Sequence, residues 1–414
     1  MGKFKYVIIG NGICGSTAAE ILRAKESQST IAVVDEENKP LYSRVLLPAY
    51  VKGTIKRENV FLKTESFWRD NNIEFLGGKS VVKLDDEKRK VILSDDSEIS
   101  FEKVFVASGG DVKRSDLPGQ DLEGVHYLRT IDDADSIIKT IERIKKSPEN
   151  KRKIVILGGS FIGLELASCF AVHGIGGIIV IRRPYYWADK LDKVSSSLLA
   201  STIENNGFKI ISSSGIDHIS GEEKVEGVKI ISGETYECAG VGMGLGIDLN
   251  TDFLEESHVK VSDGIETDEY LETSVPGIYA GGDVAKFMNP IIGRKMRFGN
   301  WTNSIFQGRL AAENMLGGRH AVDFISGYGA TYFGVPVSFV GDVSGEDGAQ
   351  IVQRGESGWQ EQLFVRNNFI IGATLINVPK DRMTLTSLIK NKVEFKDIGV
   401  LADASQNLAS YING

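Results

Sequence analysis

Two copies of one strand–turn–helix pattern constrain the fold of this 414-residue chain more than any other feature of its sequence. The first copy covers residues 6–15, where the apolar run YVII leads into the turn GNGICG. The second covers residues 154–163, where IVIL leads into GGSFIG. An apolar strand that enters a G-x-G-x-x-G turn and then a helix is typical of a parallel α/β sheet with a phosphate site at the turn. We therefore predict an α/β fold with two domains of this kind.

Each turn is suited to the pyrophosphate of a dinucleotide. Glycines allow a tight turn and a close approach of the backbone, and a helix start offers N–H groups that have no intrahelical partner. Ser160 replaces the middle glycine of the second turn, where it either loosens the pyrophosphate contact or adds a hydroxyl to it. The residues predicted to line the two sites are Gly10, Gly12, Ile13, Cys14 and Gly15 in the first turn, and Gly158, Ser160, Phe161, Ile162 and Gly163 in the second.

An acidic pair follows the second strand of the first domain. Residues 31–34 read IAVV and lead directly into Asp35 and Glu36. A carboxylate at the tip of this strand is where a dinucleotide-binding fold holds ribose hydroxyls. Asp35 is the preferred candidate because it directly follows the apolar run, and Glu36 is the alternative.

Two further apolar strands end in small residues. Residues 104–110 read VFVASGG, and residues 277–285 read GIYAGGDVA. Small residues let a backbone lie against a ligand, and the single carboxylate of the second segment can accept a hydrogen bond from a hydroxyl. The contacts predicted here are Ala107, Ser108, Gly109, Gly282 and Asp283.

Charge and composition exclude several classes of function. The net charge of −8 argues against a nucleic-acid-binding protein. No apolar run reaches the roughly 18 to 20 residues of a membrane-spanning helix, and the first strand starts too early to leave room for a signal peptide. We therefore expect a cytoplasmic protein. The three cysteines and five histidines show no metal-ligand spacing, so we expect no metal site.

The ordered set of motifs resembles the FAD- and NAD(P)H-dependent pyridine-nucleotide oxidoreductases of the glutathione-reductase structural class, over residues 4–320. The resemblance implies two Rossmann-like nucleotide-binding domains and a small α/β C-terminal domain. It also implies that the first turn, with residues 107–109 and 282–283, binds FAD and that the second turn binds NAD(P)H. Residues 40–48, PLYSRVLLP, and residues 128–130, LRT, are similar to rubredoxin and ferredoxin reductases and to the flavoprotein part of NAD(P)H nitrite reductases.

The same resemblance assigns roles to single residues. Glu165 is expected beside the nicotinamide amide. Trp301 is expected beside the flavin, where the N-terminus of the helix that follows would stabilise negative charge on reduced flavin. Glu165 and Trp301 are therefore the predicted catalytic residues. Arg44, Val82 and Arg129 are predicted among the FAD contacts.

The resemblance and the pattern of elements together predict the domain organisation. Amphipathic patterns indicate helices over residues 132–146 and 302–316, and alternation indicates a hairpin over residues 81–93. The last domain is compatible with a homodimer. The predicted segments are 1–112 (FAD-binding, first part), 113–245 (NAD(P)-binding), 246–320 (FAD-binding, second part) and 321–414 (α/β interface domain).

The chain lacks the cysteine that disulfide- and peroxide-reducing relatives carry beside the flavin. Within residues 42–48, the single-cysteine position reads Val45. Disulfide chemistry needs a thiolate, so the flavin must exchange electrons directly with another acceptor. We expect an FAD-dependent NAD(P)H:acceptor oxidoreductase whose partner is an iron–sulfur or rubredoxin/ferredoxin-type carrier, or subunits of a larger complex. The alternatives are an NAD(P)H oxidase that uses oxygen, and a flavoprotein scaffold with a degraded nicotinamide site.

The second strand of the second domain predicts which nucleotide is preferred. It ends in Arg182 and Arg183 rather than in an acid. A carboxylate at this tip binds the 2′-hydroxyl of NADH, whereas a guanidinium binds the 2′-phosphate of NADPH. Replacing both arginines with alanine is therefore expected to abolish a preference for NADPH in kcat/KM. An NADPH/NADH ratio unchanged by the double substitution would refute this assignment.

Overall fold

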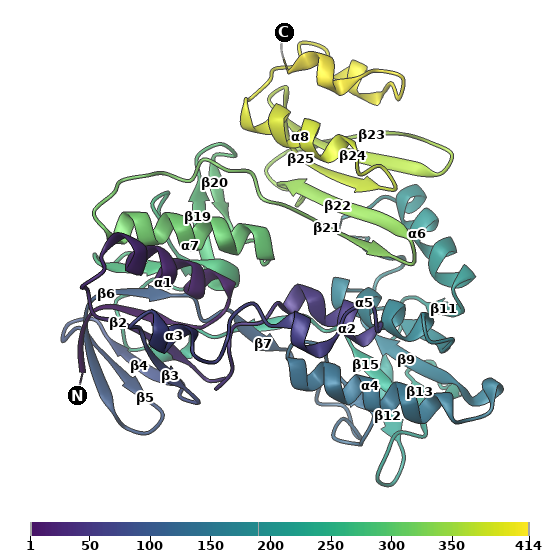
Figure 1. The fold of residues 1–414 in the computed structure, drawn as a ribbon. Helices are drawn as coiled ribbons and strands as arrows, with labels where there is room; N and C mark the ends of the chain where they lie inside the picture. The colour runs from purple at the N-terminus through teal and green to yellow at the C-terminus, as the bar shows by residue number, and fades with distance from the viewer. Residues whose placement is uncertain (1, 189, 413–414) are drawn as a thin grey trace. The chain divides into compact units, whose positions relative to one another are not determined.

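The first apolar run forms an inner strand of a mixed sheet in the computed structural model, which describes residues 2–188 and 190–412 (Figure 1). The contacts within the chain divide it into two units. Unit 1 comprises Met1–Ser43, Phe61–Asp111 and Asp248–Tyr328, and unit 2 comprises Arg44–Val60, Val112–Ile247 and Gly329–Gly414. No helix of the described residues is long and apolar enough to cross a lipid bilayer.

Unit 1 is built on a sheet in the order β3-β2-β1-β6-β5-β4, with β18 also paired to β6. The strands β1, β2, β3, β6 and β18 are parallel, and β5 and β4 extend the sheet in antiparallel fashion. Val7 and Ile9 of β1 face one apolar cluster, whereas Tyr6 and Ile8 face the other. Because both faces of the strand are buried, its sequence is a continuous apolar run rather than an alternating one.

The helices α1 and α7 lie side by side on one face of this sheet (Figure 1). Gly308 permits their close approach, since a Cβ there would overlap the carbonyl oxygen of Cys14. The helices of unit 1 are α1 (Ile13–Lys25), α3 (Phe67–Asp70) and α7 (Trp301–Met315). Its strands are β1 (Gly2–Ile9), β2 (Ile31–Asp35), β3 (Glu74–Gly77), β4 (Val81–Asp85), β5 (Lys90–Leu93), β6 (Glu98–Val106), β17 (Ile265–Glu266), β18 (Ile278–Ala280), β19 (Ala285–Asn289) and β20 (Arg294–Met296), and β7 (Gly110–Val112) pairs with β16 (Ile247–Leu249).

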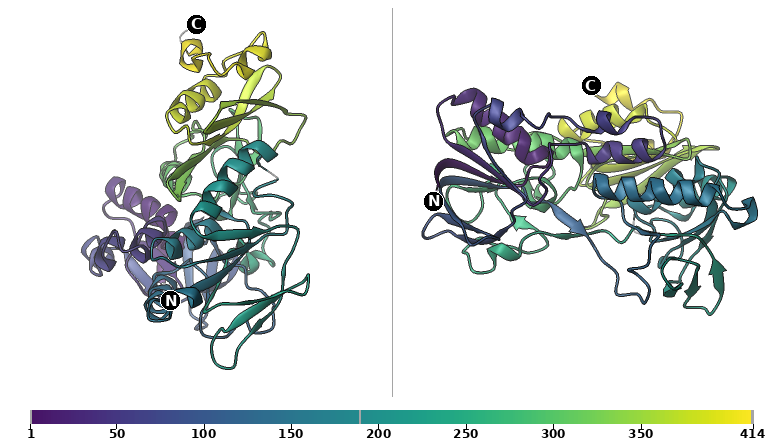
Figure 2. Two further views of the ribbon diagram at one scale, coloured as in Figure 1. Left: turned by 90° about the vertical axis from the view of Figure 1, so that its right-hand side faces the viewer. Right: turned by 60° about the horizontal axis from the view of Figure 1, so that its bottom comes forward.

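Unit 2 contains a parallel sheet in the order β11-β10-β9-β15-β8 and an antiparallel sheet in the order β21-β22-β25-β24-β23. Helix α8 covers one face of the second sheet (Figure 2). The helices are α2 (Leu47–Val51), α4 (Ile131–Lys145), α5 (Phe161–Ala171), α6 (Lys193–Asn205) and α8 (Asp381–Lys390). The strands are β8 (Val125–His126), β9 (Lys153–Leu157), β10 (Gly176–Val180), β11 (Phe208–Ile211), β12 (Ile216–Ser220), β13 (Gly227–Ile230), β14 (Thr235–Glu237), β15 (Val241–Met243), β21 (Gly327–Tyr332), β22 (Val335–Gly341), β23 (Gln350–Glu356), β24 (Trp359–Arg366) and β25 (Phe369–Ile376).

Residues 44–60 differ from the predicted domain organisation, which placed them in the first FAD-binding segment. They group with unit 2 because α2 packs against α5. The thiol of Cys169 donates to the carbonyl oxygen of Pro48 over 3.7 Å, and His173 Nε2 lies 3.0 Å from the carbonyl oxygen of Val51. These contacts join residues more than 100 positions apart, so they cannot be predicted from the sequence around either residue.

A buried histidine makes unit 2 sensitive to acid. His126 on β8 is 4% exposed, and its Nε2 lies 2.9 Å from the hydroxyl of Thr140 on α4. Burial, with the charge of Arg143, lowers the pKa of His126 from 6.5 to about 4. The native state therefore resists a proton that the unfolded chain accepts below its ordinary pKa, and stability falls as the pH drops from about 6.5 to about 4.

Replacing His126 with Gln is expected to flatten this acid dependence. The wild-type chain should lose up to ~3 kcal/mol across that window through His126 alone, and the variant should lose that much less. Urea unfolding of both proteins between pH 7 and pH 4 measures the difference. A His218→Gln variant is the control because 40% of the His218 side chain is exposed. Identical slopes for wild type and His126→Gln would contradict the prediction.

Candidate functional site

The first glycine turn divides its three glycines between two tasks. Gly10 has a φ of +109°, and a Cβ there would overlap the carbonyl oxygen of Ala107. A Cβ on Gly15 would overlap the carbonyl oxygen of Gly10. A Cβ on Gly12, in contrast, would meet no atom within 4 Å. Gly10 and Gly15 are therefore required for main-chain packing, whereas Gly12 faces open space that suits the close approach of a pyrophosphate.

The start of α1 complements this open space. Gly12 is the N-cap and supplies no side-chain hydrogen bond, and the first turn of the helix carries no acidic residue. The first intrahelical hydrogen bond runs from Ser16 N to Gly12 O. The N–H groups of Ile13, Cys14 and Gly15 therefore belong to the donors that a helix start leaves without intrahelical partners. These donors and the positive end of the helix dipole fit a phosphate.

The two acidic candidates at the end of β2 behave differently. The carboxylate of Asp35 accepts the N–H of Asn11 at 2.5 Å and the N–H of Glu37 at 2.8 Å. It thus ties the second strand to the glycine turn. Glu36, directly after it, has an exposed side chain. The sequence favours Asp35 as the residue that binds the ribose. In the structure, its hydrogen bonds to main-chain N–H groups show that it stabilises the turn.

Three segments far apart in the sequence meet at this turn. Ala107 packs against Gly10, as described above, and the Ser108 hydroxyl donates to the carbonyl oxygen of Asn250 at 2.8 Å. A Cβ on Gly282 would lie 3.5 Å from the sulfur of Cys14. Pairing of β18 with β6 brings the last two segments together. Unit 1 thus collects the predicted FAD residues of positions 10–15, 107–109 and 282–283.

Helix α7 carries the predicted residue Trp301 and two residues that the sequence analysis missed, Asn303 and Gln307. Trp301 is its first residue and is half-buried. The Oε1 atom of Gln307 accepts the N–H of Gly282 at 2.6 Å, so this fully buried side chain fixes the turn before Asp283. Within the described part of the chain, Gln307 Nε2 and Asn303 Oδ1 are buried atoms with no hydrogen-bond partner. The sequence signal for these two residues was their spacing, because two polar residues four positions apart share one face of a helix, and buried polar groups need partners.

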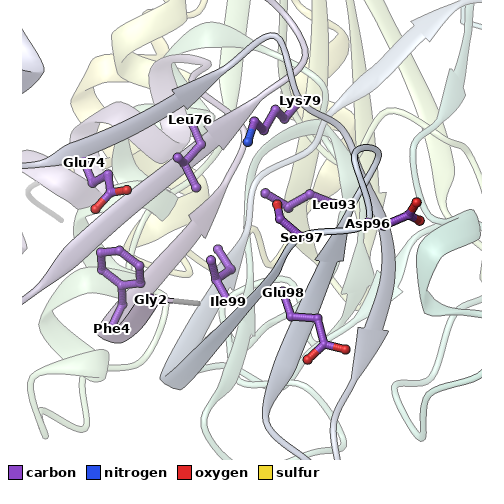
Figure 3. Close-up of a pocket in the computed structure, with 10 residues that line it drawn as sticks. All are labelled: Gly2, Phe4, Glu74, Leu76, Lys79, Leu93, Asp96, Ser97, Glu98 and Ile99. Carbon is purple, nitrogen blue, oxygen red and sulfur yellow. The ribbon is translucent and has the colours of Figure 1, made fainter.

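The remaining unit 1 candidate, Val82, is exposed on β4. The segment that leads into this strand lies beside the acidic tip of β2, because Lys79 N donates to Asp35 O at 3.1 Å. Lys79 also lines a pocket on the same unit. Its lining includes Phe4, Leu76 and Ile99, and none of its lining residues belongs to a predicted site (Figure 3).

The second turn, in unit 2, repeats this packing with one change. Gly158 has a φ of +110° and abuts the carbonyl oxygen of Gly244, and Gly163 abuts the carbonyl oxygen of Gly158. Ser160 is the N-cap of α5, and its hydroxyl accepts the N–H of Gly163 at 3.2 Å. The serine therefore takes up one donor that the glycine of the first turn leaves to a ligand. Phe161 and Ile162 follow as the first two residues of α5.

An ion pair accompanies the second turn. Glu165 on α5 lies 3.6 Å from the ammonium of Lys52, with about a sixth of each side chain exposed. Burial raises the pKa of Glu165, and the Lys52 charge opposes that shift. Lys52 was not among the predicted residues, since it comes from residues 44–60, whose contact with α5 is not visible in the sequence. The pair places a carboxylate with a fixed partner two residues beyond Gly163.

The arginine candidates all belong to unit 2. Arg44 Nη1 donates to the carbonyl oxygen of Arg129 at 2.7 Å, so these two predicted FAD contacts are held together. Arg182 and Arg183 are exposed just after β10. Ser213 N donates to the carbonyl oxygen of Arg183 at 3.1 Å, which fixes the main chain there.

Residues 4–308 match the sequence pattern of the family described as pyridine nucleotide-disulphide oxidoreductase. The chain belongs to this family. The match spans both glycine turns and all the predicted site residues named above. It confirms the family resemblance, and with the structural comparison below it confirms the mixed α/β fold.

Relatives of this chain include several reductases. The chain is 27% identical over 420 residues to the NAD(P)H nitrite reductase of Bacillus subtilis (strain 168), an alignment that covers 100% of the chain and 51% of that protein. It is 26% identical over 388 residues to the rubredoxin–NAD(+) reductase of Pseudomonas putida, covering 93% and 98%. The structure of the ferredoxin reductase for the CYP199A2 system from Rhodopseudomonas palustris matches with a TM-score of 0.87 and 26% identity, covering 98% and 99%. The chain thus spans about half of the nitrite reductase and nearly all of the other two, and the prediction of an oxidoreductase with FAD and NAD(P)H as cofactors is confirmed.

The chemistry in the family's name needs a thiol that this chain does not place at position 45. Val45 stands there with 60% of its surface exposed. The three cysteines, Cys14, Cys169 and Cys238, are buried and free. Burial raises the pKa of Cys169 and of Cys238 to about 12, and raises that of Cys14 well above its ordinary value. These thiols therefore stay protonated at neutral pH and are poor nucleophiles.

Because Gly12 faces open space and Gly15 packs against main chain, alanine substitutions at the two positions are expected to affect different properties. Gly12→Ala is expected to leave the chain folded and to weaken FAD binding at least about tenfold, ~1.4 kcal/mol, because its Cβ enters the open space of the turn. Gly15→Ala is expected to lower thermal stability, because its Cβ meets main chain. Circular dichroism and FAD titration of the flavin-free protein measure both. Wild-type FAD affinity in Gly12→Ala would contradict this account of the turn.

Proposed function

We propose that this chain carries electrons between NAD(P)H and a one-electron carrier, an iron–sulfur or rubredoxin-type protein or the partner subunit of a larger complex, through a bound FAD. The observation that carries the proposal is the pairing of two dinucleotide turns with a valine at the position of the redox cysteine. Hydride enters as two electrons, and without a thiol the electrons leave the flavin directly. The names of the relatives, which include rubredoxin and ferredoxin reductases, support this class of partner.

Unit 1 supplies the residues that would hold FAD. The N–H groups at the start of α1 and the space above Gly12 receive the pyrophosphate. Glu36 binds the adenosine ribose, while Asp35 holds the turn in place through Asn11. Asp283 accepts a hydroxyl of the ribityl chain, and Gln307 fixes the main chain before it. FAD, when bound, contributes the ability to accept a hydride and to release electrons one at a time.

Unit 2 supplies the residues that would hold the nicotinamide nucleotide. The turn at residues 158–163 receives its pyrophosphate, with the Ser160 hydroxyl as an added polar contact. Arg182 and Arg183 bind the 2′-phosphate, which makes NADPH the preferred donor. The Glu165 carboxylate accepts the N–H of the nicotinamide amide, and Lys52 orients that carboxylate and opposes the rise in its pKa that burial causes. Orientation is what these residues contribute, because holding the two reactants in place makes hydride transfer effectively intramolecular.

Helix α7 would stabilise charge at the flavin. It begins at Trp301 with Asn300 as N-cap, and its first turn carries no acidic residue. The positive end of the helix dipole favours the negative charge that builds up on reduction. Trp301, half-buried at this point, would shield the ring from water. We propose that the enzyme works in the cytoplasm, where free buried cysteines persist and NAD(P)H is supplied.

Anaerobic mixing of the FAD-loaded protein with NADPH or NADH in a stopped-flow instrument tests the first half of the reaction. The visible absorbance of the flavin is expected to bleach with both nucleotides and faster with NADPH. Ferredoxin or rubredoxin should then restore the colour faster than air-saturated buffer does. Reoxidation by oxygen alone at the faster rate would identify an oxidase, and no bleaching with either nucleotide would leave only a scaffold role.

A substitution at Glu165 tests the nicotinamide contact. Glu165→Gln removes the charge from the acceptor and is expected to weaken NADPH binding about tenfold, because hydrogen bonds to charged groups are the stronger ones. The dependence of the bleaching rate on NADPH concentration gives the dissociation constant. Glu142→Gln, on the exposed face of α4, is the matched control. Equal NADPH affinity for the two variants would remove Glu165 from the site.

A further inference from the structure

A short segment in unit 2 connects the parallel sheet that precedes the second glycine turn to helix α6. It also contacts the antiparallel sheet β21-β22-β25-β24-β23, which we call the C-terminal sheet. It follows β10 and ends where α6 begins, and we call its described residues, 182–188 and 190–192, the strap. The strap begins with Arg182 and Arg183, the two exposed cations predicted to bind the 2′-phosphate. Its path therefore decides where those guanidinium groups can reach.

Gln362 on β24 holds the far end of the strap. This side chain is only 4% exposed. Its Oε1 atom accepts the N–H of Asp192 at 3.0 Å, and its Nε2 atom donates to the carbonyl oxygen of Lys190 at 3.0 Å. Asp192 in turn caps α6 by accepting the N–H of Ser195 at 2.7 Å. One buried amide from the C-terminal sheet thus fixes both the strap and the start of the next helix.

Trp187 anchors the middle of the strap. Its ring is 5% exposed and lies 4.7 Å, centroid to centroid, from Phe161 at the start of α5. It also lies 5.6 Å from Phe339 on β22 and 6.1 Å from Tyr332 on β21. Trp187 has a φ of +51°, a left-handed conformation that a bulky residue adopts only when tertiary contacts hold it there. The aromatic contacts with both the nucleotide turn and the C-terminal sheet supply that hold.

Two main-chain hydrogen bonds hold the near end of the strap. Ser214 N and Ser213 N donate to the carbonyl oxygens of Ile181 and Arg183, each at 3.1 Å. Pro184 follows and disfavours a helical conformation at Arg183. Pro184 and Tyr185 are exposed or half-buried, whereas Tyr186 is only 1% exposed and its ring lies 5.7 Å from that of Trp187. The direction in which the strap leaves the arginines therefore depends on the buried pair Tyr186 and Trp187 and on the hydrogen bonds of Gln362.

We propose that Gln362 and Trp187 are positioning residues for nucleotide selectivity. They act through the strap on Arg182 and Arg183, so the C-terminal sheet determines how well the chain distinguishes a nucleotide with a 2′-phosphate from one without it. This inference rests on the proposed function, which assigns the 2′-phosphate to the two arginines. It adds Gln362, a residue of the C-terminal sheet, to the residues that determine this selectivity.

Calorimetric binding to the FAD-loaded protein, without turnover, tests the inference. The probes are adenosine 2′,5′-bisphosphate, which carries the 2′-phosphate, and ADP, which does not. Gln362→Ala is expected to bind the bisphosphate at least about fivefold more weakly and to bind ADP within about twofold of wild type. Gln353→Ala is the matched control, because Gln353 is exposed on the neighbouring strand and faces Gln362 in the register. It is expected to bind both probes as the wild type does.

Variants at Trp187 separate positioning from general damage. Trp187→Phe keeps an aromatic ring and is expected to retain wild-type selectivity, whereas Trp187→Ala should behave as Gln362→Ala. A merely structural role would weaken both probes equally, and that result for Gln362→Ala would overturn the inference. So would unchanged binding of both probes.

The failure of the proposed nucleotide assignment gives a different result. If the arginines bind the 2′-phosphate, replacing both with alanine removes the preference for the bisphosphate. A double variant that keeps the preference would overturn the NADPH assignment together with this inference. Loss of preference in the double variant but not in Gln362→Ala would overturn the inference alone.

Discussion

Close contact between main-chain atoms at the first glycine turn is the constraint on which the candidate FAD site of unit 1 depends. Gly10 touches Ala107 and Gly15 touches Gly10, so β1, α1 and the end of β6 are joined without intervening side chains. Of the three glycines of the turn, this packing leaves only Gly12 facing open space. The N–H donors at the start of α1 therefore border an open space whose shape is set by backbone rather than by flexible side chains.

The second turn keeps the same contacts but not the same chemistry. Gly158 and Gly163 repeat the packing, whereas the Ser160 hydroxyl occupies one helix donor. Unit 2 also contains the Glu165–Lys52 ion pair, the exposed Arg182 and Arg183, and the aromatic contacts of Trp187. The first turn is thus suited to a tightly held cofactor. The second is suited to a nucleotide that arrives, reacts and leaves.

The sequence predicted those features that depend on neighbours along the chain. Both turns, the apolar strands and the helix at residues 302–316, which is α7 in the structure, follow from local periodicity and glycine spacing. The task of Asp35 could not be predicted, because its partner Asn11 lies on another strand end. Lys52 was invisible for the same reason, since its partner Glu165 lies more than 100 residues away. Gln307 carried a signal, a buried amide on a helix, but its partner Gly282 appears only in the fold.

The central claim is that one FAD sits at the first turn and exchanges electrons with a nicotinamide. Native purification followed by flavin extraction and an anaerobic titration with NADPH measures it most directly. The account predicts a yellow protein with about one FAD per chain that one equivalent of NADPH bleaches. A correctly folded, colourless protein that takes up no FAD on reconstitution would contradict it.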